Sequence, residues 1–142
     1  MTKEKLSSSL EDYLEVIYNY IDKNEKVRAI DISKELNVSR ASVTEALKKL
    51  ADKKLINYGR YDMISMTEYG RKQAIEVIEK HNALQYFFEE IMGLDSNEAA
   101  QTACKIEHII SENVFDRLTD LRNFHEDHPE YTEAFKKYYR EN

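Results

Sequence analysis

The sequence predicts a mostly α fold that contains one small β-hairpin. Apolar residues recur every three or four positions along most of the 142 residues, which is the periodicity of amphipathic helices. Only 3 Gly and 1 Pro interrupt the chain, so few positions force a helix to end. One stretch, residues 55–67, instead combines β-forming residues with a Gly-containing turn and predicts the hairpin.

The N-terminal part predicts three helices before the hairpin. The first carries an apolar stripe from Leu10 to Ile21 and follows serines that can cap it. A second, short helix fits residues 30–36, and Ser39 can cap a third. Two helices joined by a tight turn form a helix-turn-helix, and the hairpin that follows completes a winged helix-turn-helix with a small wing.

The C-terminal part predicts helices only. A long helix over residues 68–92 ends at Gly93, and three further helices follow, the last beginning near Pro129. We therefore divide the chain into a winged helix-turn-helix DNA-binding domain, residues 1–72, and an all-helical domain, residues 73–142.

Charge is distributed unevenly between these parts. The chain as a whole carries −6, but residues 27–72 carry +4 and residues 73–142 carry −8. A basic segment beside an acidic one indicates two functions in one chain. In a winged helix the third helix enters the major groove, where Lys and Arg neutralise phosphates and Ser, Thr or Glu reach base edges. The candidate DNA-binding residues are Arg28, Ser39, Arg40, Ala41, Ser42, Thr44, Glu45, Lys48, Lys49 and Arg60. The alternative is that these residues form only the solvated faces of a small helical domain.

Composition excludes several other classes of protein. No apolar run approaches the roughly 18 residues of a membrane span, and the start lacks the apolar core of a signal peptide, so we expect a cytoplasmic protein with no membrane partner. We find no Gly-rich phosphate loop and no nucleophile paired with a base, and therefore expect no enzyme. The single cysteine, Cys104, cannot form an internal disulfide, so it is a reduced core residue, a reactive thiol or a metal ligand.

Cys104 is followed at three and four residues by Glu107 and His108. On a helix these three side chains share one face, and a thiolate, a carboxylate and an imidazole together suit a first-row transition ion. The alternative is a buried cysteine beside surface charges. His81 interrupts the apolar stripe of the long helix, as a ligand or as a hydrogen-bonded core histidine.

Two other groups of polar residues are either metal ligands or ordinary solvated residues. Asp12 and Glu15 are three residues apart in the first helix, where they are either ligands or part of a solvated face. The run from His125 to His128 could hold a second metal, but we prefer a capped, solvated loop.

The combination of these motifs resembles the diphtheria toxin repressor family of metal-dependent bacterial repressors. The resemblance rests on residues 11–18 (EDYLEVIY), the winged helix with Val43-Thr44 in its third helix, Lys80-His81, and residues 103–108 (ACKIEH). The brevity of the chain is similar to the manganese-responsive branch, whereas iron-responsive members continue into a further domain.

The resemblance implies a function and a ligand set. It implies a homodimeric repressor of metal uptake genes that binds a palindromic double-stranded DNA operator, with Mn(II) or Fe(II) as corepressor at a site of one or two ions. The implied metal ligands are Asp12, Glu15, His81, Cys104, Glu107 and His108. Asp12 resembles the manganese branch and Cys104 the iron branch, while Gln85 and Ala100 stand where an ancillary iron-branch site has a carboxylate and a second His.

Two other functions remain open from the residues alone. A metal-independent winged-helix regulator that senses an organic ligand predicts DNA binding that is indifferent to chelators. A metalloenzyme would use the same ligands with one open coordination position.

Overall fold

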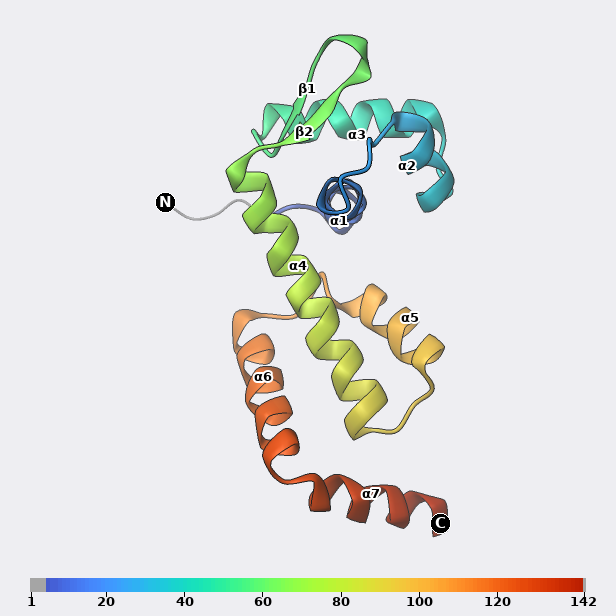
Figure 1. The fold of residues 1–142 in the computed structure, drawn as a ribbon, viewed down its shortest axis with the longest axis vertical. Coiled ribbons are helices and arrows are strands. Elements are labelled where there is room, and N and C mark those ends of the chain that lie inside the picture. The colour runs from blue at the N-terminus through green and yellow to red at the C-terminus, as the bar shows by residue number, and fades with distance from the viewer. Residues whose placement is uncertain (1–4, 142) are drawn as a thin grey trace. The chain divides into compact units, whose positions relative to one another are not determined.

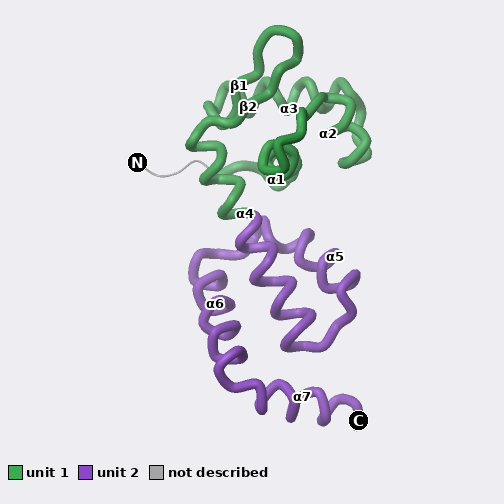
Figure 2. Tube along the Cα trace, viewed as in Figure 1, with its two compact units in different colours: residues 1–77 green, residues 78–142 purple. Residues whose placement is uncertain are grey.

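The mostly α fold is confirmed by the computed structural model, which describes residues 5–141 (Figure 1). The chain forms two compact units, residues 1–77 and residues 78–142 (Figure 2). The division falls inside helix α4 (Glu68–Tyr86), and the predicted boundary after residue 72 lies in the same helix.

The N-terminal unit begins with three helices. They are α1 (Ser8–Asp22), α2 (Ala29–Leu36) and α3 (Arg40–Asp52). Ser7 caps α1 and Ser39 caps α3, each through a side-chain oxygen that accepts a backbone N–H of the first turn. Asn37 adopts the left-handed conformation (φ 55°) in the tight turn between α2 and α3, as its short polar side chain allows.

The wing is a two-stranded antiparallel hairpin. Strand β1 (Ile56–Tyr58) pairs with β2 (Ile64–Met66), so that Asn57 lies opposite Ser65, and a 3-10 turn over Arg60–Asp62 joins them. The predicted winged helix-turn-helix is therefore confirmed. Its core contains large apolar side chains from all three helices and from the start of the hairpin; the largest fully buried ones are Leu14, Ile17, Ile32, Val43, Leu47, Leu50, Leu55 and Ile56.

The hairpin is joined closely to α4. The Thr67 hydroxyl donates to the Lys54 carbonyl at 2.7 Å and accepts the Gly70 backbone N–H at 2.9 Å, so Thr67 caps α4. A Cβ placed on Gly70 would collide with the carbonyl oxygen of Leu55. Glycine at this position is therefore what allows the first turn of α4 to lie against the end of the hairpin.

The C-terminal unit consists of helices. Helix α4 continues into a π-helical turn over Phe87–Ile91 and ends at Gly93, whose φ of 80° favours glycine. Three helices follow: α5 (Ser96–Ile106), α6 (Glu112–Asp127) and α7 (Pro129–Glu141). The predicted loop from His125 to His128 is wrong, because α6 continues through Asp127 and ends only at His128.

Few large apolar side chains of the C-terminal unit are buried. Among its described residues the buried ones are Ala83, Leu84, Ala99, Ala103, Glu107, His108 and Thr132. Large aromatic side chains of α6 and α7 are exposed instead, including Phe124 (47%), Tyr131 (61%) and Phe135 (44%). An exposed apolar surface of this kind is typical of a unit that packs against another chain. Within residues 5–141, no helix combines the length and the apolar character that a membrane crossing requires.

Candidate metal centre

His81 is the residue at which the candidate ligands meet. It lies on α4, and its side chain is 15% exposed. Its Nδ1 is 2.6 Å from Oε2 of Glu107 and 3.7 Å from Sγ of Cys104. His81 is therefore a member of a polar cluster with Glu107 and Cys104 and not an isolated core histidine.

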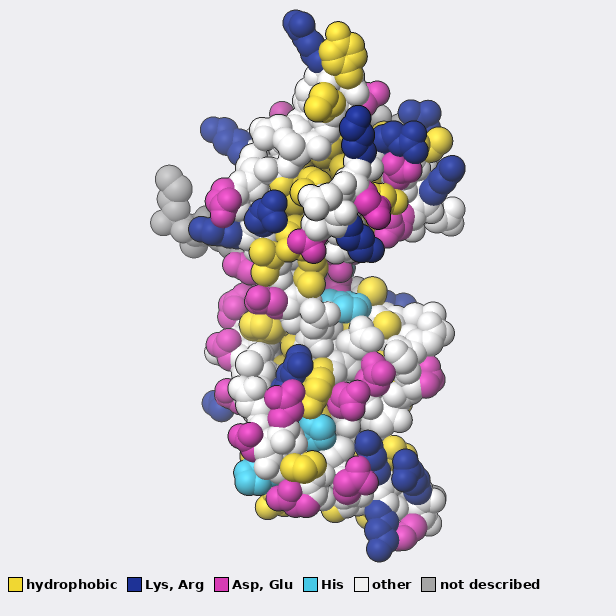
Figure 3. All heavy atoms as spheres, viewed as in Figure 1, with side chains coloured by type: hydrophobic (Ala, Val, Ile, Leu, Met, Phe, Trp, Pro, Cys, Tyr) yellow, Lys and Arg dark blue, Asp and Glu magenta, His cyan; other side chains and the backbone are white. Residues whose placement is uncertain are grey.

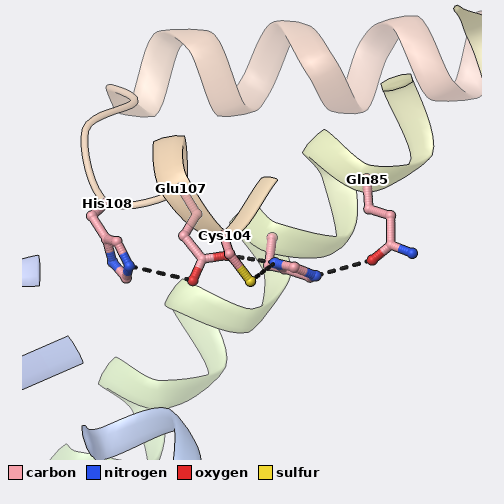
Figure 4. A network of polar contacts seen from close by, with 5 residues as sticks. Gln85, Cys104, Glu107 and His108 are labelled. Atoms are coloured by element: carbon pink, nitrogen blue, oxygen red, sulfur yellow. Dashed lines mark hydrogen bonds and ion pairs between the residues drawn. The ribbon is translucent and has the colours of Figure 1, made fainter. Parts of the chain in front are cut away.

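Glu107 lies between two histidines. Its side chain is 1% exposed; Oε2 faces His81, and Oε1 lies 3.5 Å from Nε2 of His108, whose side chain is 5% exposed (Figure 4). Burial of a carboxylate is costly unless it is paired or binds a cation. Glu107 is thus held in the protein interior by imidazole groups that can themselves bind a metal.

The motif of Cys104, Glu107 and His108 does not lie on one continuous helix. Helix α5 ends at Ile106, Glu107 is its C-cap residue, and His108 belongs to the turn that follows. Glu107 keeps helical backbone angles (φ −58°, ψ −29°), so Cys104 and Glu107 still face the same side. The expectation of one shared helix face is therefore wrong for His108, which reaches Glu107 from the turn.

The donor atoms fit a divalent transition-metal ion. One ligand atom each from His81, Cys104 and Glu107 lies within 4.8 Å of the others, and these three residues offer imidazole nitrogen, sulfur and carboxylate oxygen. Cys104 is exposed, Glu107 is buried and His81 is intermediate, so the group reaches from the interior to the surface. Mixed nitrogen, sulfur and oxygen ligands suit first-row transition ions rather than Ca²⁺ or Mg²⁺.

The other two candidate ligands belong to the N-terminal unit. Asp12 and Glu15 lie on α1, three residues apart, and both are half-buried. Their assignment as ligands stays a prediction.

Gln85 is a polar neighbour whose role the ligand prediction did not include. It lies one helical turn after His81 on α4, and its Oε1 is 3.0 Å from Nε2 of His81. Its Nε2 donates to Oε2 of Glu89 at 3.3 Å. The spacing of four residues between His81, Gln85 and Glu89 was the available signal, because side chains at i and i+4 meet on a helix.

A second polar contact in this unit joins α4 to α6. The Tyr86 hydroxyl is hydrogen bonded to Nδ1 of His125 at 2.7 Å, and the Arg122 guanidinium lies 4.4 Å from the centre of the Tyr86 ring. Burial raises the pKa of Tyr86 above its ordinary value, so the hydroxyl stays protonated at neutral pH. His125 therefore has a structural partner in Tyr86. We do not assign a second metal site to residues 125–128.

The candidate DNA-binding residues lie on the N-terminal unit, over which Figure 3 shows many Lys and Arg side chains. All are exposed except Thr44, which is half-buried. Several of their side chains have local partners: Ser39 caps α3, Glu45 pairs with Lys49 at 3.4 Å, and the Thr44 hydroxyl donates to the Arg40 carbonyl at 3.0 Å. Their contacts with DNA stay predictions.

Arg28 illustrates such a local role. Its guanidinium Nε donates to Oδ2 of Asp31 at 3.1 Å, and its backbone N–H donates to the same oxygen at 3.1 Å. The hydrogen bond from the Arg28 side chain holds the pKa of Asp31 below its usual range. Arg28 thus stabilises the start of α2 in addition to carrying charge.

Two family models together match most of the chain. The iron dependent repressor N-terminal DNA binding domain matches residues 5–63, and the iron dependent repressor metal binding and dimerisation domain matches residues 67–136. An uncharacterized HTH-type transcriptional regulator of Methanocaldococcus jannaschii is 38% identical over 114 residues, covering 80% of this chain and 91% of that protein. The chain belongs to the iron-dependent repressor family.

Further members of the iron-dependent repressor family agree in sequence and in fold. The HTH-type transcriptional regulator MntR of Listeria welshimeri is 35% identical over 128 residues, 90% of this chain and 89% of that protein. The solved structure of the manganese regulator SloR superposes with a TM-score of 0.73 and 27% identity over 87% of this chain. This chain covers 55% of the solved SloR chain, or about half its length.

Membership of the iron-dependent repressor family establishes the general function. The protein is a metal-dependent, DNA-binding transcriptional repressor, with a DNA-binding domain and a domain for metal binding and dimerisation. It acts as a homodimer on DNA and requires a divalent metal, and the family consists of transcriptional regulators. The predicted family is confirmed.

Proposed function

We propose that this repressor uses Mn(II) or Fe(II) as its corepressor and controls genes of metal uptake. The observation that carries the proposal is the convergence of His81, Cys104 and Glu107, whose donor atoms lie within 4.8 Å of one another. His108 joins them through Glu107. The likeness to the solved structures of the manganese regulator SloR and of a manganese-dependent transcriptional repressor supports manganese as one of the two candidate metals.

We further propose that Asp12 and Glu15 complete the ligand set from α1, as the family resemblance implies. Six donor residues from the two domains would accommodate one ion or a pair of neighbouring ions. A bound ion would supply positive charge that offsets the negative charges of the three carboxylates in this ligand set. Carboxylate and imidazole ligands suit Mn(II), whereas the Cys104 thiolate favours Fe(II), Zn(II) or Co(II).

Charge repulsion provides the coupling between metal and DNA. Asp12, Glu15 and Glu107 carry like charges, and these repel one another when no cation is shared between them. These three carboxylates would hold a shared ion, whose positive charge would remove the repulsion and link α1 to the helical domain. Metal would then favour DNA binding if these residues bind it more tightly in the DNA-competent state than in other states.

DNA is read by α3 and the wing. Ser42 and Thr44, near the start of α3, contact base edges, while Arg40, Lys48, Lys49 and Arg60 contact phosphates. A homodimer related by a twofold axis presents two such helices, so its operator is a palindrome. Metal uptake genes are the expected targets, because their repression by the metal-loaded protein lowers metal import when metal is abundant.

The ligand assignment is tested by metal titration under anaerobic conditions. Isothermal calorimetry with Mn(II) and Fe(II) would compare the wild type with Glu107→Ala and His108→Ala, and His128→Ala is the matched control because His128 lies at the end of α6 outside the site. Both site variants are expected to lose high-affinity metal binding while keeping the circular dichroism spectrum of the folded chain. Wild-type affinity in either site variant would contradict the assignment.

A further inference from the structure

One tyrosine stands out from the surface of the N-terminal unit. Tyr61 lies at the tip of the wing, between β1 and β2, and is 93% exposed. Within residues 5–141 no other large apolar or aromatic residue is as exposed. An aromatic ring in water contributes none of the stabilisation that its burial would give. Packing within the chain therefore does not account for a tyrosine at this position.

The backbone at Tyr61 is also unusual for an aromatic residue. Its φ of 64° and ψ of 25° lie in the left-handed region, which Gly, Asn and Asp adopt readily and bulky residues adopt rarely. Backbone conformations of this kind cluster at functional sites, where another requirement outweighs their cost. A contact with another molecule would supply that requirement for Tyr61.

The wing holds Tyr61 in a fixed position relative to α3. The backbone N–H of Leu55 donates to the Leu50 carbonyl at 3.0 Å, and both side chains are buried in the core of the unit. This contact joins the end of α3 to the start of the hairpin. The N–H of Gly59 donates to the Met63 carbonyl at 3.2 Å and closes the loop at the tip. The hairpin thus carries Tyr61 beyond α3 (Figure 1).

The charges beside Tyr61 suit a polyanion. Arg60 is exposed and directly precedes the tyrosine. Asp62 follows it, and Oδ1 of Asp62 accepts a hydrogen bond from the Tyr58 hydroxyl at 3.2 Å. Burial raises the pKa of Tyr58 above its ordinary value, so this hydroxyl stays a donor at neutral pH. The loop therefore presents a cation and a ring, while its carboxylate is hydrogen bonded to a strand residue.

We propose that Tyr61 enters the minor groove of the DNA duplex, next to the major-groove segment that α3 binds. The minor groove is about 6 Å wide, so it admits one side chain but not a helix. Proteins that bind this groove commonly combine Arg with a large apolar or aromatic side chain. Arg60 would hold the phosphate backbone at the edge of the groove. The proposal rests on the proposed DNA contacts of α3 and adds a specificity residue, because only G·C pairs place an amino group in this groove.

Inosine substitution tests the minor-groove contact. The probe is the duplex that the protein retains most strongly from fragmented genomic DNA, in whichever metal condition retains it. A second duplex carries inosine at every guanine, which keeps the major-groove atoms and removes only the minor-groove amino group. Fluorescence anisotropy is expected to show tighter binding of the inosine duplex by the wild type, and equal binding of both duplexes by Tyr61→Gly. No preference in the wild type, or the same preference in both proteins, would overturn the proposal.

Tyr61→Gly also separates a DNA contact from a structural role. Glycine adopts the left-handed conformation freely, so the variant is expected to have a Tm at least as high as that of the wild type. Its affinity for the inosine duplex is expected to fall about tenfold, as loss of a partly buried ring predicts. The salt slope should stay unchanged because tyrosine carries no charge. Tyr61→Phe keeps the ring and should bind like the wild type. The control is Tyr69→Ala, which removes an exposed ring from α4.

The same titrations distinguish failure of this proposal from failure of the proposed function. Wild-type affinity in Tyr61→Gly, together with weakened binding in Lys48→Ala, would overturn only the contact of Tyr61. Wild-type affinity in both variants would also contradict the proposed reading of DNA by α3 and the wing. Weakened binding of Tyr61→Gly with a lowered Tm would indicate a structural role for the tyrosine and would overturn the proposal.

Discussion

Oε2 of Glu107 lies 2.6 Å from Nδ1 of His81, although the two residues are 26 positions apart in the sequence. The contact brings the end of α5 against the middle of α4 and places a carboxylate in the interior of the C-terminal unit. Its partners there are groups that bind metals. We propose that a cation bound by these groups acts at this junction between two helices of the C-terminal unit.

Glu107→Gln is expected to abolish stabilisation of the protein by metal. A ligand that binds only the folded state stabilises it by about 2.7 kcal/mol at 100 times its Kd, and the amide removes the charge that attracts the ion. Thermal unfolding with and without Mn(II) measures the effect as a shift in Tm. The control is Glu133→Gln, at an exposed glutamate of α7. An equal Tm shift in Glu107→Gln and the wild type would show that Glu107 is not a ligand.

Cys104→Glu is expected to change the preference among metals. Replacing the thiolate with a carboxylate should raise the affinity for Mn(II) relative to Co(II) by about tenfold or more, because hard oxygen ligands suit Mn(II) and sulfur favours Co(II). Competition titrations with both ions measure the ratio. Wild-type protein loaded with Co(II) should also show a sulfur-to-cobalt charge-transfer band that Cys104→Ser lacks. The same band in both proteins would exclude Cys104 as a ligand.

Lys48→Ala is expected to weaken DNA binding without changing sequence preference. Loss of one phosphate contact should weaken binding similarly on all sequences and reduce the salt slope of log K by about 1 per contact. Fluorescence anisotropy at several salt concentrations measures both quantities. Lys137→Ala, in α7 of the other unit, is the control. A wild-type salt slope in Lys48→Ala would mean that Lys48 does not contact phosphate.

Gly70→Ala is expected to lower the free energy of unfolding by about 1–3 kcal/mol, since overpacking against the Leu55 carbonyl forces the backbone to shift. Gly59→Ala is the control, because a Cβ at Gly59 meets nothing within 4 Å, and its effect should stay within about 0.5 kcal/mol. Urea unfolding measures both variants. Equal stabilities would contradict the close approach of α4 to the hairpin.

The sequence allowed a good prediction of the N-terminal unit because its signals are local. The serine caps, the apolar spacing of α1 and α3, and the β-forming residues around Gly59 each act within a few residues. The structure places them as expected, and the winged helix follows from their order.

Errors and omissions occurred where long-range contacts decide the structure. Nothing in the local sequence ends α5 at Ile106, so His108 was expected on the helix rather than in the turn. The sequence predicts a solvated loop at His125 because the contact of His125 with Tyr86, 39 residues away, leaves no periodic signal. The sequence shows Gln85 only as a departure from an ancillary site, since its contacts depend on His81 and Glu89 together.

The central claim is that metal converts this protein into its DNA-binding state. The most direct test is to incubate the purified wild type under anaerobic conditions with fragmented genomic DNA from its source and to sequence the retained DNA. Chelator, Mn(II) and Fe(II) would be compared in parallel, with Zn(II) as a control for raw affinity. Discrete fragments retained only with Mn(II) or Fe(II), each with a palindrome near metal uptake genes, are the predicted result. Retention of the same fragments in chelator would contradict the claim.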